Sequence, residues 1–94
     1  MEGARMIRDS FYRFPPNKRA VTTPLYEQIA YMSGEVDEVM QAHFDGEGDD
    51  RIIEETMDVI QCAEGILRKF PTWRVLQGWA KVKIKCRQRG DYEG

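Results

Sequence analysis

Four carboxylates recur in two matched pairs whose residue type and spacing suit a hard divalent cation. Glu35 and Glu38 are three residues apart, as are Glu55 and Asp58, so each pair shares one face of a helix. On a helical wheel the first acid of each pair lies roughly 90° from the centre of its apolar stripe, and the second roughly 150° on the same side. Such carboxylates repel by about 4 kcal/mol at 4 Å and an effective dielectric of 20. A proton or a cation must relieve that repulsion, and a ligand set of oxygens alone favours Mg²⁺, with Mn²⁺ as a substitute.

The alternative for these acids is an ordinary solvated helix face, and one ExxE pair alone does not distinguish the two. Two other metal motifs fail on residue type. The segment 45–50 resembles a calcium loop at its first, third and fifth positions, but Asp50 stands where glycine is needed and Thr56 where a bidentate glutamate is needed. Ferritin-like di-iron sites need Glu-x-x-His pairs, which the single His43 does not complete.

Three amphipathic helices are predicted to carry these residues. The first runs from about 24 to 44 and stops at Asp45-Gly46. The second opens at Gly48-Asp49-Asp50, with an aspartate as cap, and ends before Pro71. The third is capped by Thr72 and ends at Gly90. No segment alternates convincingly as a strand, so we expect an all-α chain, and the short connectors predict an antiparallel helical bundle.

The sequence divides into three parts. Residues 1–23 contain a Pro15-Pro16 pair and no sustained period, which predicts an irregular N-terminal arm. Residues 24–90 form the helical domain, and residues 91–94 are a short C-terminal tail. With 94 residues the chain is a single domain and a marginal monomer that a partner subunit would help to stabilise.

Charge is strongly segregated along the chain. Residues 1–23 carry a net charge of +3, residues 24–66 carry −11 and residues 67–94 carry +6. No apolar run approaches the roughly 20 residues of a membrane span, and the N-terminal residues lack the apolar region of a signal peptide. We therefore expect a cytoplasmic protein that does not enter a membrane.

The acidic segments resemble a known family. Gly34-Glu35-Val36-Asp37-Glu38-Val39 and Glu54-Glu55-Thr56-Met57-Asp58-Val59 are similar to the ExxE…ExxD signature of the MazG-like all-α nucleoside triphosphate pyrophosphohydrolases, with 16 residues between the two halves. The segment Lys85-Cys86-Arg87-Gln88-Arg89-Gly90-Asp91-Tyr92 is similar to the basic tail of that family. The resemblance extends over roughly residues 24–90.

The resemblance implies hydrolysis of a (deoxy)nucleoside triphosphate between its α and β phosphates, giving a monophosphate and pyrophosphate. Glu35, Glu38, Glu55 and Asp58 would be the catalytic carboxylates, hold one or more Mg²⁺ and orient or deprotonate a water. Lys83, Lys85 and Arg89 would bind the phosphates. Single-domain members are homodimers or homotetramers, which implies that three main helices per chain form half of a four-helix bundle completed by oligomerisation.

Two other functions are compatible with parts of the sequence. A nucleic-acid-binding module could use the basic third helix, although the charge of −11 in the middle of the chain would repel a polyanion. A non-catalytic helical dimerisation module would tolerate neutral amides at Glu38 or Asp58, because the change removes repulsion. A metal site would instead lose its Mg²⁺-dependent thermal protection.

Overall fold

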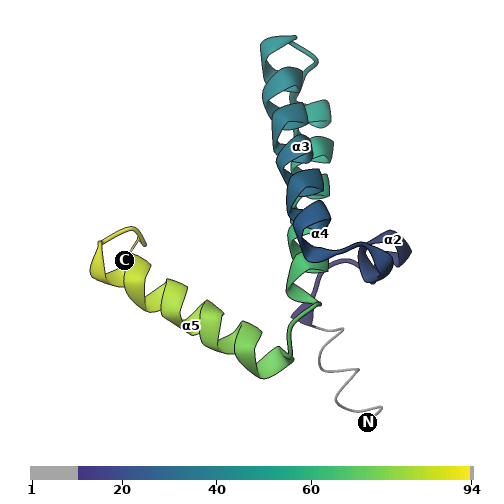
Figure 1. Ribbon diagram of the computed structural model, residues 1–94. Helices are drawn as coiled ribbons and strands as arrows, with labels where there is room; N and C mark the ends of the chain where they lie inside the picture. Colours follow the sequence, from purple (N-terminus) through teal and green to yellow (C-terminus); the bar gives the residue numbers. More distant parts are fainter. Residues whose placement is uncertain (1–10, 94) are drawn as a thin grey trace.

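The computed structural model describes residues 11–93, all of whose regular structure is helical (Figure 1). In chain order the helices are α2 (Lys18–Thr22), α3 (Leu25–Phe44), α4 (Asp49–Leu67) and α5 (Thr72–Gln88). The expected all-α class is confirmed. None of these helices is long and apolar enough to cross a membrane within the described part of the chain.

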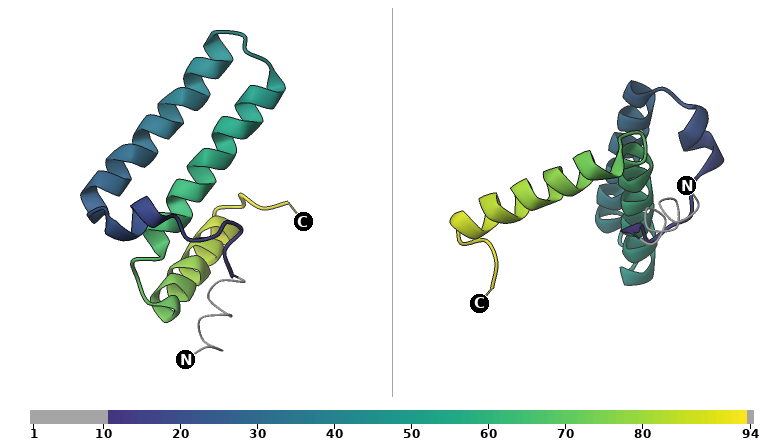
Figure 2. Two further views of the ribbon diagram at one scale, coloured as in Figure 1. Left: turned by 90° about the vertical axis from the view of Figure 1, so that its right-hand side faces the viewer. Right: turned by 90° about the horizontal axis from the view of Figure 1, so that it is seen from below.

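Helices α3 and α4 form an antiparallel hairpin, and they lie side by side in every view (Figures 1 and 2). Gly46, with φ 66°, and Gly48, with φ 97°, turn the chain between them in a left-handed conformation that side-chain-bearing residues rarely adopt. The backbone N–H of Glu47 donates to the carbonyl of Ala42 and closes the end of α3. Both helices therefore have nearly the predicted bounds, although Gly48 rather than an aspartate is the N-cap of α4.

Helix α5 departs from the sequence prediction. It was expected to pack antiparallel on α4, but it turns away from the hairpin after residues 68–71 and projects to one side (Figures 1 and 2). Pro71 has an extended ψ of 147°, which stops α4 from continuing and redirects the chain. Phe11 contacts the middle of α5 through an edge-on ring contact with Trp79, at 4.9 Å between centroids. A three-helix antiparallel bundle is thus not formed within one chain.

The hairpin buries polar rather than apolar side chains. Gln28, Glu55 and Glu64 are buried, and Ala42 is the one buried hydrophobic residue within α3 and α4. In the predicted apolar stripe of α3, Ile29 at 48% and Val36 at 46% remain exposed. In that of α4, Ile52, Val59 and Ile66 are only half-buried. The carboxylate-bearing edges of the two helices therefore face each other, and the apolar stripes are only partly covered.

The molecule is open for its size. Its accessible surface is 7496 Å², whereas a compact monomer of 11.0 kDa exposes roughly 5,600 Å². Its radius of gyration is 15.6 Å, against about 12.4 Å expected for a compact domain of this length. Much of the exposed surface is apolar, and on α5 it includes Trp73, Leu76, Trp79, Val82 and Ile84.

The described part of the N-terminal arm is more ordered than its sequence pattern predicts, and residues 1–10 of that arm lie outside the described residues. The arm contains α2, whose N-cap Asn17 accepts a hydrogen bond at 2.9 Å from the backbone N–H of Arg19 through Oδ1. Thr23 donates its hydroxyl to the Arg19 carbonyl at 2.6 Å, at the end of this helix. Segment 11–23 is thus a structured element that crosses the open end of the α3–α4 hairpin.

Candidate metal and ligand site

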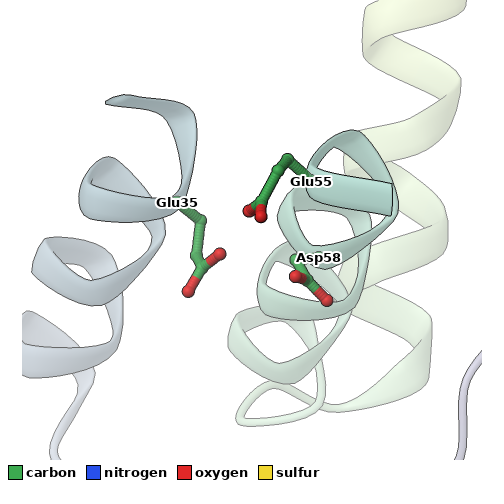
Figure 3. Close-up of side chains that lie close together, drawn as sticks. All are labelled: Glu35, Glu55 and Asp58. Carbon is green, nitrogen blue, oxygen red and sulfur yellow. The ribbon is translucent and has the colours of Figure 1, made fainter. Parts of the chain in front are cut away.

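Three of the four predicted carboxylates meet between α3 and α4. Glu35 comes from the middle of α3, and Glu55 and Asp58 come from successive turns of α4 (Figure 3). One carboxylate oxygen of each residue lies within 4.8 Å of the others. This meeting follows from the helical register, because i and i+3 positions share a face and the hairpin turns those faces toward each other.

Glu38 lies near the same group, one turn further along α3. Its pKa is raised above the usual 4.5, first by its side-chain contact with Glu55 and then by the negative charges of Glu35 and Glu55. The cause is the like-charge repulsion expected from the spacing. All four acids singled out in the sequence are therefore brought into electrostatic contact.

Glu55 is the most buried member of the cluster, with 3% of its surface exposed. Its Oε1 lies 2.6 Å from a guanidinium nitrogen of Arg51, one turn earlier on the same helix. Its Oε2 is buried with no hydrogen-bond partner among the described residues. An ionised oxygen left unpaired out of water costs several kcal/mol, and a divalent cation is the partner that the surrounding carboxylates would also attract.

A pocket of about 420 Å³ opens beside the carboxylates, bounded by α2, α3 and α4. Glu35 and Asp58 line it on the acidic side. The remaining lining residues come from the arm and from the first half of α3 and the middle of α4: Asn17, Arg19, Ala20, Thr23, Glu27, Gln28, Tyr31, Gln61 and Cys62. A volume of this size falls within the range of small-molecule sites.

The pKa of the Cys62 thiol is affected by the charges around this pocket. Its pKa is raised above the usual 9.0, first by burial and then by the negative charge of Glu35, with a smaller contribution of the same sign from Asp58. The positive charge of Arg19 acts in the opposite direction. The thiol therefore lies within the electrostatic reach of both the carboxylates and the arm.

The three cations predicted to bind phosphate lie elsewhere in the single chain. Lys83, Lys85 and Arg89 belong to α5 and its C-cap, which project away from the hairpin, and none of them lines the acidic pocket (Figure 1). Arg89 pairs with Asp91 at 2.8 Å. Lys83 lines a separate, largely apolar pocket between the end of α4 and α5. Their phosphate-binding role stays a prediction, because one chain does not bring them to the carboxylates.

Sequence reasoning missed the pocket residues supplied by the arm and by the first turns of α3. Arg19 lies on a helix of five residues, too short to show a hydrophobic period. The Asn17 side chain, a favoured N-cap type, was the one local signal that a helix begins there. Gln28 lies on the correctly predicted α3, but no spacing rule separates a pocket residue from any other polar residue on a helix. Tyr31 is one of several aromatic residues that the sequence offers for stacking on a base, and it does line the pocket.

The chain matches no protein-family model, no curated protein and no solved structure.

Proposed function

We propose that this protein is a Mg²⁺-dependent hydrolase that converts (deoxy)nucleoside triphosphates to monophosphates and pyrophosphate. The observation that carries the proposal is the buried Glu55 Oε2, which has no partner among the described residues and lies within a group of three further carboxylates. The ExxE…ExxD resemblance supplies the reaction class.

Glu35, Glu38, Glu55 and Asp58 are the residues that would hold the metal, since carboxylate oxygens are the ligands Mg²⁺ and Mn²⁺ prefer. When bound, the cation neutralises phosphate charge and lowers the pKa of a coordinated water. Hydrolysis would add a water across the α–β anhydride, and one of these carboxylates would accept the water proton as pyrophosphate leaves.

The adjoining pocket supports a small-molecule substrate. It is about 420 Å³ in volume and is continuous with Glu35 and Asp58, so a substrate that contacts a cation at these residues has room beside them. The pocket also contains an aromatic ring, Tyr31, and the amides of Gln28 and Gln61. Such groups suit a ligand with a polar heterocycle and a charged tail.

The exposed apolar surface supports an assembly of identical chains, either a homodimer or a homotetramer. The accessible surface exceeds that of a compact monomer by roughly 1,900 Å², and stable interfaces remove about 800 Å² from each partner. A second chain packed on the exposed stripes would complete a four-helix core. It would also bring another copy of α5 to the hairpin, and with it Lys83, Lys85 and Arg89.

A non-catalytic helical dimerisation module is the second candidate, because the same exposed apolar surface serves it equally well. That module needs no cation, so it gives no account of the unpaired Glu55 oxygen. Nucleic-acid binding has weaker support, since the basic α5 is joined to a strongly acidic hairpin.

The test is incubation of the protein with a panel of NTPs and dNTPs, with Mg²⁺ or with EDTA, and identification of products by phosphorus NMR. We expect monophosphate and pyrophosphate with Mg²⁺, none with EDTA, and turnover lowered on the order of 100-fold by Glu55→Gln. Glu54→Gln is the matched control, since Glu54 is the exposed neighbour on the same helix. Release of orthophosphate would contradict cleavage between the α and β phosphates and would indicate a different phosphatase reaction. Absence of turnover, with no effect of Mg²⁺ on melting, would favour the dimerisation module.

A further inference from the structure

The arm is fastened to α4 by a buried carboxylate outside the acidic cluster. Glu64, 9% exposed, accepts the backbone N–H of Arg13 on Oε2 and that of Phe14 on Oε1, each at 2.9 Å. Arg68, one turn later, donates to the Phe14 carbonyl, and its guanidinium carbon lies 4.2 Å from the centre of the Tyr12 ring. Because two successive backbone N–H groups donate charge-assisted hydrogen bonds to one carboxylate, the arm is held against α4 in a defined position.

From this anchor the chain continues into α2, which packs closely against the hairpin. The side-chain amide of Gln28 donates to the Ala20 carbonyl. Gly65 lets α2 approach, because a Cβ at that position would lie 3.1 Å from the Cβ of Ala20. The arm is therefore held at both ends of its described course, and it forms one wall of the 420 Å³ pocket.

Arg19 is the charged residue that this wall contributes. Its guanidinium carbon lies 3.8 Å from the centre of the Tyr31 ring, so one planar face is covered by the aromatic side chain. No described carboxylate forms an ion pair with it. The N–H groups at the edge of the guanidinium remain available, and their fork geometry matches two oxygens of a phosphate.

On α3, another residue that lines this pocket has an atom without a partner. Oε1 of Gln28 is buried without a hydrogen bond among the described residues, and the residue is 7% exposed. Gln28 lines the pocket together with Arg19. A pocket that offers a held cation and an unsatisfied buried acceptor is equipped for a ligand that carries both anionic oxygens and hydrogen-bond donors.

We propose that Arg19 binds phosphate oxygens of the substrate, and that Glu64 is a positioning residue that holds Arg19 in the pocket by fixing the arm. The inference rests on the proposed function for the identity of the substrate. It assigns the polyphosphate chain to the space between Arg19 and the carboxylates Glu35 and Asp58, which would hold the cation.

The test is calorimetric titration of inorganic tripolyphosphate into the full chain in the presence of Mg²⁺. Arg19→Gln should weaken binding by about 10- to 100-fold, the usual range for a charge-assisted pair, and Arg19→Lys should recover part of the loss. Lys18→Gln is the matched control, because Lys18 is the neighbouring cation on α2 and does not line the pocket. Equal affinity of wild type and Arg19→Gln would overturn the proposal, as would failure of the wild type to bind tripolyphosphate.

Two further measurements separate this inference from the proposed function. A phosphate-free nucleoside should bind wild type and Arg19→Gln equally, and a loss confined to the nucleoside would overturn the phosphate assignment in favour of base contact. Glu64→Gln keeps one acceptor of two, so it should raise the nucleotide KM with little change in kcat or in the Mg²⁺-induced rise in melting temperature. Hydrolysis that is intact in every variant would overturn the role of the arm but not the proposed hydrolase function. Tripolyphosphate binding that depends on Arg19, without any turnover, would support the role of Arg19 and overturn the hydrolase function.

Discussion

The guanidinium of Arg51 neutralises one oxygen of Glu55 at 2.6 Å, while the other oxygen of the same carboxylate has no partner among the described residues. Arg51 therefore supports the charge of Glu55 without filling the space in front of it. The pair is formed one turn apart on α4, so it does not depend on the position of α3. This local contact holds Glu55 in place while its second oxygen stays unpaired among the described residues, an arrangement that a cation would complete.

Replacing Arg51 with methionine should destabilise the metal-free protein and enlarge its response to Mg²⁺. We expect a loss of about 1–2 kcal/mol, because the buried Glu55 carboxylate loses its hydrogen-bonded partner. Mg²⁺ should then raise the melting temperature of this variant by more than it raises that of the wild type. Thermal melting with and without MgCl₂ measures both effects. Glu47→Gln is the control, since it removes only the exposed 3.7 Å contact of Arg51 and should change stability by less than about 0.5 kcal/mol. A Mg²⁺ response equal to that of the wild type would contradict the prediction.

Replacing Glu38 with glutamine should raise the melting temperature of the metal-free protein and reduce the protection given by Mg²⁺. The first effect follows from relief of the repulsion by Glu35 and Glu55 that raises the Glu38 pKa. The second follows from loss of a ligand. Asp37→Asn, at an exposed neighbouring position of α3, controls for the change in net charge. An unchanged Mg²⁺ shift in Glu38→Gln would remove that residue from the metal site.

The raised pKa of Glu38 predicts a specific pH dependence. Because the folded-state pKa lies above the unfolded value of 4.5, the folded protein holds the proton more tightly. The resulting contribution to stability is fully present below the unfolded value and is lost as the pH rises through the folded pKa. Mg²⁺ competes with this proton, so its affinity should rise over the same interval. Denaturant titrations across that interval, and calorimetry in buffers of different ionisation enthalpy, test the linkage; a slope that persists in Glu38→Gln would assign it to another group.

Cation binding should lower the pKa of the Cys62 thiol. Glu35 and Asp58 contribute to raising that pKa, and a divalent cation between them offsets their charge. The thiolate absorbance of a Cys86→Ser protein, titrated with base in the presence and absence of Mg²⁺, isolates Cys62. The downward shift should shrink when Glu35 is replaced by glutamine. No shift in the parent protein would place the cation elsewhere.

A charge on the exposed apolar face of α5 should weaken self-association. Val82 is 50% exposed, and Val82→Glu would place a carboxylate in an apolar interface, at a cost of at least about 10-fold in the association constant. Gln77→Glu puts the same charge at an already polar position of α5 and should leave association unchanged. Sedimentation velocity across a range of concentrations measures both. A wild-type chain that stays monomeric at the highest concentration would contradict the assembly.

The sequence was informative where structure follows from local periodicity. The bounds of α3 and the proximity of Glu35 to Glu55 depend on helical spacing and on a short turn at Gly46–Gly48. Both are determined by residues close together in the sequence. The direction of α5 is different, because Pro71 ends one helix without specifying where the next one goes. Arg19 was missed because its position depends on contacts with residues more than 40 positions away in the sequence. The chief ones are the two hydrogen bonds that Glu64 accepts from backbone N–H groups of the arm.

The projection of α5 from the hairpin has a kinetic consequence. If working sites form only when α5 of one chain meets the hairpin of another, the number of sites at low abundance grows with the square of the number of chains rather than in proportion to it. Dilution would then silence the protein without any inhibitor, and a modest rise in expression would produce a disproportionate rise in turnover. A projecting helix that completes the site of another chain would thereby make output rise more steeply than abundance.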